Sequence, residues 1–321
     1  MQKLLRAGAL LFCLFALSAN AQTYPNKAIR LVVPYPPGAL TDLLARAIGE
    51  RLGAALKQPV VVDNRPGAGT LVGAEVVAKS AADGYTLLMA TSTTLGISPA
   101  LYRKSPINPV RDFAPVSQVG AVTFFLIASP AFAAKSVTEM IDLAKANPGK
   151  FNYASVGNGS PHHLFMEVLK KDAGLDIQHV PYRGTLAAMP DLLTGKIHVM
   201  FSDATAAVPN IQAGKVVALG TSSAKPTALI AAVPTIAESV PGFDWQAWQG
   251  VVAPAGTPPT VLARLSAELQ RIQGAAEFRE LLQKFGMDPS PPNTPEQFAA
   301  IVRNDVERWA KAVAASGAQV D

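Results

Sequence analysis

The segment from Pro36 to Asp42 has the residue types of an anion-binding loop. Two prolines and a glycine separate an apolar run, 30–33, from a segment whose first residues, Thr41 and Asp42, suit the first turn of a helix. The chain therefore turns sharply from a strand into a helix N-terminus, where backbone N–H groups have no acceptor within the helix and bind anions. Asp42 has two interpretations that the sequence leaves open. As a structural residue it caps this helix or complements its positive end, and as a functional residue it binds a water or a donor group of the ligand.

Three further segments repeat this composition after strand-like runs: 65–70, 90–94 and 155–160. In open α/β sheets, ligands bind beyond the carboxyl ends of the strands, at such loops. Because the four loops are divided between the two halves of the chain, we predict a binding cleft between two domains. Arg65 in the second loop could pair with a ligand carboxylate or with a neighbouring acid, and the second interpretation is favoured.

A nucleophile and a base could be supplied by Ser160 and His163, which are close in the sequence. The surrounding residues do not form a G-x-S-x-G elbow, and the sequence names no acid partner for the pair. A serine hydrolase is therefore only an alternative, and we predict that the protein is not an enzyme. His163 begins a helix after a glycine loop, which also makes it a candidate residue of the cleft.

The sequence predicts neither a cofactor nor a metal. The glycines at 67, 69 and 73 are spaced G-x-G-x-x-x-G, which is only part of a dinucleotide-binding pattern and favours a tight turn with close helix packing. His162 and His163 are adjacent and cannot face one way on a helix, and the chain has no HExxH motif and no cysteine pair.

Strand-like and helix-like segments alternate along the chain, which is typical of α/β domains built on parallel sheets. We expect an α/β fold with two doubly wound domains. The expected strands are 29–33, 60–62, 85–89, 122–128, 151–155, 179–181, 197–201 and 216–221, and the expected helices are 41–56, 70–79, 137–146, 161–171, 187–193, 259–285 and 295–315.

The first 21 residues have the features of a signal peptide. Lys3 and Arg6 precede an apolar segment, 7–17, and the small-x-small residues 19–21 predict cleavage after Ala21. The only cysteine falls in this segment, so the exported chain would have no disulfide, which fits a bacterial periplasm. No later apolar segment is long enough to span a membrane without charges or prolines.

Basic residues are scattered along the chain. The net charge is +5, and loss of Lys3 and Arg6 with the signal would lower it to +3. Without a Lys/Arg run or interleaved aromatic residues, the sequence argues against nucleic-acid binding. A mild positive excess suits the attraction of small anions.

Several ordered stretches together resemble one family, the Bug (TctC-type) proteins, which are the periplasmic substrate-binding components of tripartite tricarboxylate transporters. The resemblance begins at Tyr24-Pro25 and continues through the first loop. It covers essentially the whole exported chain, and its stretches are 29–38, 64–69, 83–88, 112–116, 146–150, 153–155, 179–184 and 253–258.

The resemblance implies a periplasmic-binding-protein type II architecture whose two domains are joined by a hinge. Domain 1 would comprise 22–122 plus 222–321, and domain 2 would comprise 123–221. In such proteins a ligand carboxylate is held mainly by backbone N–H groups of the first strand–helix loop and by the loops that face it. Carried onto this sequence, the implied ligand-binding residues are Tyr35, Gly38, Ala39, Thr41, Asp42, Gly69, Thr70, Thr91, Thr93, Ser155, Gly157, Ser160, His163, Tyr182 and Asp203.

The sequence departs from the family pattern at Ala39, where a second glycine is usual, and at Ser202 and His198, where acids are common. These departures leave the substrate open, so the predicted ligand is a di- or tricarboxylate, an amino acid or an aromatic acid. The resemblance implies membrane permease subunits as partners. The alternative is a periplasmic sensor that binds the same ligand and signals to a sensor kinase of a two-component system.

Overall fold

The computed structural model describes residues 24–320, so the predicted signal peptide lies outside the described residues. Two sheets form the framework, one of six strands in the order β11-β4-β10-β3-β1-β2 and one of five in the order β7-β6-β8-β5-β9. The strands are β1 (Ile29–Val33), β2 (Val60–Asn64), β3 (Thr86–Thr91), β4 (Phe113–Val122), β5 (Phe124–Ala128), β6 (Phe151–Ser155), β7 (Ile177–Pro181), β8 (Val199–Asp203), β9 (Val217–Thr221), β10 (Ala247–Pro254) and β11 (Met287–Pro289).

Helices cover both faces of each sheet. They are α2 (Leu40–Leu56), α3 (Leu71–Ala78), α4 (Ser98–Leu101), α5 (Val137–Ala146), α6 (Pro161–Ala173), α7 (Thr185–Leu193), α8 (Ala204–Gln212), α9 (Pro259–Gly274), α10 (Ala276–Lys284) and α11 (Pro295–Ser316). No helix among residues 24–320 combines the length and the apolar character needed to cross a membrane.

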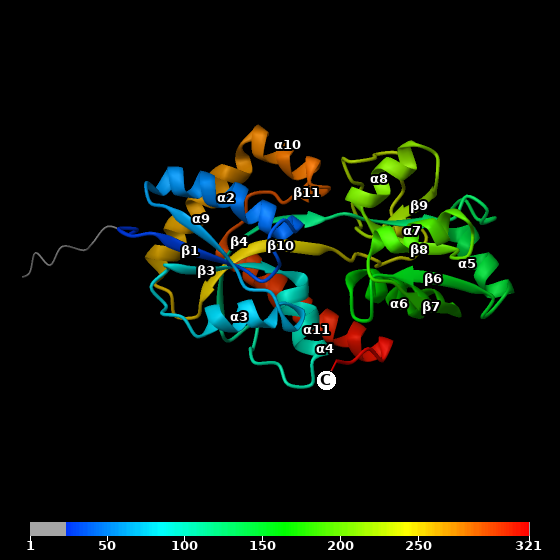
Figure 1. Cartoon of the computed structure of the whole chain (residues 1–321), viewed down its shortest axis with the longest axis horizontal. Coiled ribbons are helices and arrows are strands. Elements are labelled where there is room, and N and C mark those ends of the chain that lie inside the picture. Colours follow the sequence, from blue (N-terminus) through cyan, green and yellow to red (C-terminus); the bar gives the residue numbers. More distant parts are fainter. Residues whose placement is uncertain (1–23, 321) are drawn as a thin grey trace, which may run out of the picture.

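We call the six-stranded sheet with its helices lobe 1 and the five-stranded sheet with its helices lobe 2 (Figure 1). Side chains alternate between the two faces of a strand, and in lobe 1 both faces are apolar. Leu31 and Val33 pack under α2 and α9, whereas Val32 packs on the opposite side with α3 and α11. In lobe 2, strand β5 is likewise apolar on both faces. Leu126 packs on the side of α5 and α6, and Ile127 packs on the side of α7 and α8.

The chain passes between the lobes at two places that lie side by side. Thr123 separates β4 of lobe 1 from β5 of lobe 2, and the return passage enters lobe 1 at Ala247, which pairs with Val122. The lobes also touch through α11, where Trp309 stacks on Phe165 of α6 with the ring centroids 5.8 Å apart.

The structure confirms the α/β fold class and corrects several sequence predictions. Both sheets are mixed, because β10 is antiparallel to β3 and β4, and β5 is antiparallel to β8 and β9. The single strand predicted over 122–128 is wrong, since its residues belong to two sheets. The single helix predicted over 259–285 is also wrong, because Ala275 has an extended backbone (φ −71°, ψ 130°) that separates α9 from α10.

Candidate functional site

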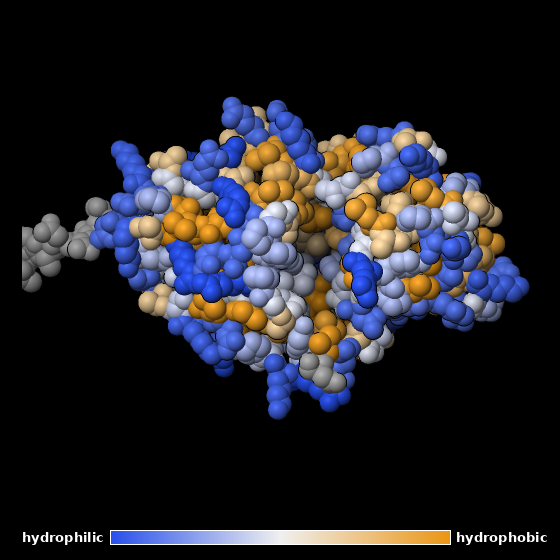
Figure 2. Space-filling model, viewed as in Figure 1, coloured by the Kyte–Doolittle hydropathy of each residue, from blue (hydrophilic) through white to orange (hydrophobic). Residues whose placement is uncertain are grey.

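A cavity of about 230 Å³ lies where the carboxyl ends of β1 and β3 meet the strands that pass between the lobes. The molecular surface is visibly hollowed between the lobes (Figure 2). Of the sequence-predicted residues, the cavity brings together Tyr35, Ala39, Thr41, Thr91 and Thr93. Its remaining lining residues are Leu40, Ser92, Val122, Phe124, Ala247, Trp248 and Gln249, and none of the twelve side chains is charged at neutral pH.

The N-terminus of α2 opens into this cavity. Ala39 occupies the N-cap position with an extended backbone (φ −67°, ψ 157°) and contributes no side-chain acceptor. The first N–H groups of a helix have no intrahelical partner, and the helix dipole adds partial positive charge there. Since Leu40 and Thr41 line the cavity, their backbone N–H groups are suited to bind an anion.

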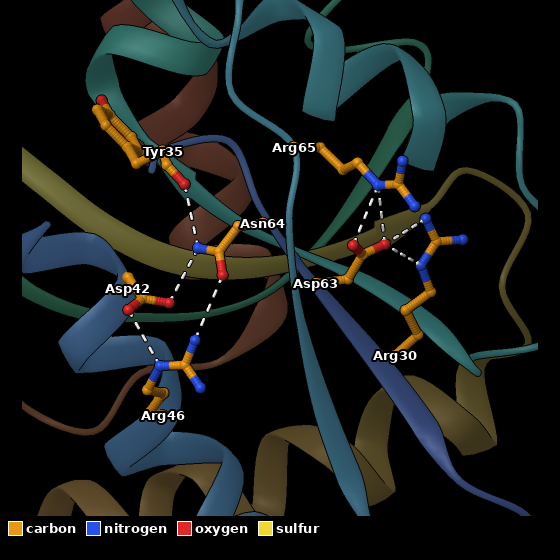
Figure 3. Close-up of polar contacts among 7 residues, drawn as sticks. All are labelled: Arg30, Tyr35, Asp42, Arg46, Asp63, Asn64 and Arg65. Atoms are coloured by element: carbon orange, nitrogen blue, oxygen red, sulfur yellow. Dashed lines mark hydrogen bonds and ion pairs between the residues drawn. The ribbon is translucent and has the colours of Figure 1, made fainter. Parts of the chain in front are cut away.

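Asp42 holds the first loop in place. Its carboxylate accepts a hydrogen bond from Gly38 N at 2.8 Å. It also accepts hydrogen bonds from Asn64 Nδ2 at 2.9 Å and Arg46 Nε at 3.0 Å (Figure 3). Burial alone would raise the pKa of Asp42, but these hydrogen bonds outweigh it and keep the pKa below its ordinary value. Asn64 also donates to Tyr35 O at 3.1 Å. Asp42 does not cap α2, but it lies in the first turn, where its charge complements the positive end of the helix. This geometry favours the structural interpretation of Asp42.

The acid–arginine cluster beside the loop accounts for Arg65. Asp63 accepts from Arg65 Nε at 3.0 Å, and Arg30 Nη2 lies 2.6 Å from the same carboxylate (Figure 3). The favoured interpretation of Arg65, a pair with a neighbouring acid, is therefore confirmed.

Hydroxyl groups form a chain along one wall of the cavity. Tyr35 Oη and Thr91 Oγ1 are 3.1 Å apart, and Thr91 Oγ1 lies 3.0 Å from Thr94 Oγ1 and accepts from Thr94 N at 3.1 Å. Burial raises the pKa of Tyr35, so its hydroxyl stays protonated. The wall therefore presents neutral groups only.

The side chains of Ser160 and His163 both form hydrogen bonds with the glycine loop that precedes α6. Ser160 Oγ donates to Gly157 O at 2.7 Å and accepts from His163 N at 3.3 Å, as an N-cap does. His163 Nδ1 accepts from Gly159 N at 3.2 Å, and its ring stacks on His179 at 4.2 Å. Burial and the neighbouring His179 lower the pKa of His163 to about 4. This geometry does not favour a serine nucleophile activated by His163.

His162 contacts a residue of the cavity wall, although its sequence context does not mark it as a cleft residue. Its ring meets the cavity residue Phe124 edge-on at 4.9 Å, and its Nε2 lies 3.7 Å from the Asp203 carboxylate. Burial tends to raise the pKa of Asp203, but the nearby His162 ring and a hydrogen bond from Thr205 Oγ1 hold it at about 2. Asp203 also caps α8 by accepting from Ala206 N at 3.3 Å.

The remaining predicted residues lie outside the cavity lining. Tyr182 Oη donates to Asp191 Oδ2 at 2.8 Å, and Gly69 O accepts from Ser98 Oγ at 2.6 Å. Ser155 Oγ lies 2.6 Å from His179 Nε2. Their roles in ligand binding stay predictions, as do those of Gly38, Asp42, Thr70, Gly157, Ser160, His163 and Asp203.

Comparison with known proteins decides the family. Residues 44–318 match the tripartite tricarboxylate transporter family receptor, TctC. The chain belongs to this family. BugT of Bordetella pertussis is 34% identical over 309 residues, which cover 95% of this chain and 94% of BugT.

Two solved structures share the fold of this chain. R. palustris Rpa4515 with adipate has a TM-score of 0.76 and 32% identity, covering 92% of this chain and 100% of the other. MatC from Rhodopseudomonas palustris with bound malate has a TM-score of 0.73 and 31% identity, covering 90% of this chain and 100% of the other. The family consists of periplasmic solute-binding proteins, so the predicted resemblance is confirmed.

In this TctC-family member, a half-buried acid on α11 binds a tryptophan of the cavity wall. Asp305 on α11 accepts from Nε1 of Trp248, a cavity residue, at 2.5 Å and from Nε1 of Trp309 at 3.0 Å. Burial raises the pKa of Asp305 to about 6, although both indole donors act to lower it. Asp305 thus links the cavity wall to the contact between the lobes.

Replacing Asp305 by Asn is expected to remove one pH dependence of stability. A pKa raised from 3.8 to about 6 means that folding favours the protonated carboxyl. The stabilisation that the protonated Asp305 carboxyl gives to the fold is fully present below pH 3.8 and is lost as the pH rises through about 6. The unfolding free energy of Asp305→Asn minus that of the wild type should therefore rise by about 2 kcal/mol from about pH 4 to about pH 7. Urea unfolding across this range measures the difference, and a difference that does not change with pH would contradict the assignment.

Proposed function

We propose that the protein captures a small carboxylate in the periplasm and delivers it to the membrane permease of a tripartite transporter. The observation that carries this proposal is the N-terminus of α2, which has no side-chain cap and opens into an uncharged cavity between the lobes. The binding partners of two solved relatives, adipate and malate, are both carboxylates and support the same ligand class.

The cavity suits a molecule with an anionic end and an apolar body. Backbone N–H groups of Leu40 and Thr41 would hold a carboxylate, which accepts several hydrogen bonds at once. Phe124 and Trp248 provide apolar and aromatic surface for the rest of the ligand. Because no cationic side chain lines the cavity, selectivity would depend on the fit of neutral groups.

We further propose that ligand binding closes the lobes about the passages near Thr123 and Ala247, with domain 1 formed by 22–122 plus 222–321 and domain 2 by 123–221. A ligand shifts such an equilibrium only by its differential affinity for the two states. Since the cavity is lined by the α2 loop and by residues of the passages themselves, a bound ligand would contact the elements that move.

Titration calorimetry of the purified exported chain against a panel of carboxylates tests this function. We expect binding of one ligand per chain, with the ligand recovered unchanged afterwards. Formation of a reaction product would contradict a receptor function and would favour the serine hydrolase instead. A bacterial strain without the protein should lose uptake of the bound carboxylate, and normal uptake would contradict the transport role. The comparisons give no support to a sensor kinase as the partner.

A further inference from the structure

Strand β2 forms an open edge of the six-stranded sheet. It is the terminal strand of lobe 1, and no strand among residues 24–320 pairs with its outer side. Ile29 N donates to Pro59 O and Arg65 N donates to Val33 O, each at 2.8 Å, so the odd-numbered residues from 59 to 65 bind β1. Because the backbone groups of successive strand residues point to alternate sides, the N–H and C=O of Val62 point away from the sheet. Such an edge can pair with a strand of another protein.

An apolar side chain and a hollow accompany this edge. Val61 lies opposite Arg30 of β1, on the sheet face where Val32 packs with α3, but its own side chain is 54% exposed. Beside it, residues 28–30, 61–63 and 65 line a hollow of about 420 Å³. An exposed apolar residue on an unpaired edge favours association with another chain. The surface therefore offers a partner both backbone hydrogen bonds and apolar contact.

Three arginines beside this edge outnumber the acids that pair with them (Figure 3). Arg30 and Arg65 share the single carboxylate of Asp63, and Arg46 pairs with Asp42. The arginine side chains are 39–54% exposed, so their guanidinium groups remain accessible. Figure 2 shows charged and apolar surface side by side over this part of lobe 1. The group carries an excess of one positive charge, and guanidinium groups bind carboxylates well.

The charge and the position of the edge select the partner. A segment with acidic side chains complements the arginines, whereas a second copy of this chain would bring two sets of arginines together. No residue of β2 lines the ligand cavity. A partner can therefore occupy the edge while the receptor holds its ligand, as delivery to a permease requires.

We propose that the β2 edge docks the receptor on its permease. An extended, acidic periplasmic segment of the permease adds a strand beside β2, with its carboxylates at Arg30 and Arg65 and an apolar side chain against Val61. This inference rests on the proposed function, because it assumes delivery to a permease. It assigns the docking contact to lobe 1 and separates it from the ligand cavity.

Uptake by spheroplasts of a strain that lacks the receptor tests the inference. Purified chain 22–321 is added at increasing concentration, together with the labelled carboxylate that binds most tightly in calorimetry. The receptor concentration at half-maximal uptake then measures docking on the permease. Calorimetry of each variant with the same carboxylate measures ligand affinity, which should stay within about twofold of the wild type because the altered residues do not line the cavity.

Two variants test the backbone edge and the charge separately. Val62→Pro removes the outward N–H and blocks strand addition with its ring, while the hydrogen bonds to β1 remain. It should raise the half-maximal receptor concentration at least about tenfold. Arg30→Gln combined with Arg65→Gln should also raise it about tenfold, and it supplies the test if Val62→Pro does not fold.

Each variant has a matched control. Val62→Ala loses packing of the same side chain against the core under α2 but keeps the N–H. Arg279→Gln removes an exposed arginine from α10, away from β2. Both controls should give the half-maximal concentration of the wild type within about twofold.

The outcomes separate the inference from the proposed function. Unchanged half-maximal concentrations in the test variants overturn the inference and leave the transport role intact. Loss of uptake that follows an equal loss of ligand affinity also overturns it. A wild-type dimer in sedimentation that Val62→Pro dissociates would assign the edge to a second copy, and binding to phosphatidylglycerol vesicles that the double arginine variant loses would assign it to lipid. If the wild type binds the carboxylate but restores no uptake, the transport role fails and the inference fails with it.

Discussion

The variant Ala39→Asp is expected to stabilise the fold and to abolish carboxylate binding. Ala39 already has the extended backbone of an N-cap residue but provides no acceptor. An aspartate there accepts from the free N–H groups of the first turn of α2, which should add about 1 kcal/mol to the free energy of unfolding. The same contact occupies the donors that the ligand needs, and the new charge repels a second carboxylate. We therefore expect affinity for any bound carboxylate to fall at least about 100-fold.

Two neutral variants at the same position separate charge from geometry. Ala39→Gly retains the backbone donors without a new acceptor and should bind with an affinity within about threefold of the wild type, since a glycine N-cap changes helix stability only slightly. Ala39→Asn caps the helix without a charge and should give an intermediate affinity. Urea unfolding and calorimetry measure the two quantities. Ala39→Asp binding a carboxylate as tightly as the wild type would show that the α2 N-terminus is not the anion site.

The variant Trp309→Ala should lose about 3–5 kcal/mol of unfolding free energy, the usual range for removing a buried aromatic side chain. Trp309 is 0% exposed and packs against Phe165 of lobe 2 and Trp245, with ring centroids 5.8 Å and 4.8 Å away. Gly96 approaches it so closely that a Cβ atom there would lie 2.4 Å from Trp309 Cδ1. The truncation therefore leaves a cavity where the lobes meet.

Trp309→Phe is the matched control, since it keeps most of the ring surface and removes the donor to Asp305. We expect it to cost about 1–3 kcal/mol, less than the alanine variant, in line with a lost hydrogen bond and a smaller cavity. Urea-induced unfolding at fixed pH gives both values. A loss below about 1 kcal/mol in Trp309→Ala would contradict the packing role, because buried tryptophans normally contribute more.

Local sequence patterns predicted the first strand and its loop well. The β-branched run before the prolines forms β1, and helix α2 ends at Leu56, where the sequence placed its end. These features depend on neighbouring residues only. Strands β4 and β10 were missed because Pro115, Gly120 and Gly250 interrupt their patterns, and their antiparallel pairing depends on residues far away in the chain.

The cavity was predictable on one side only. Its α2 loop and the threonines after β3 follow from the rule that ligands bind beyond the carboxyl ends of strands. Phe124, Trp248 and Gln249 could not be found in this way, because the pairing of Val122 with Ala247 brings them together. The sequence also favoured His163 over His162. Adjacent helix residues point about 100° apart, and only the folded structure shows that the His162 ring contacts the cavity residue Phe124.

Backbone amide signals of the ¹⁵N-labelled chain 22–321 test directly whether the N-terminus of α2 is the carboxylate site, when they are followed during titration with the carboxylate that binds most tightly. We expect the amide protons of Leu40 and Thr41 to shift downfield and to saturate with one ligand per chain, as N–H groups do when they donate to a carboxylate. Saturable binding that leaves both amide signals unmoved would contradict a carboxylate site at the N-terminus of α2.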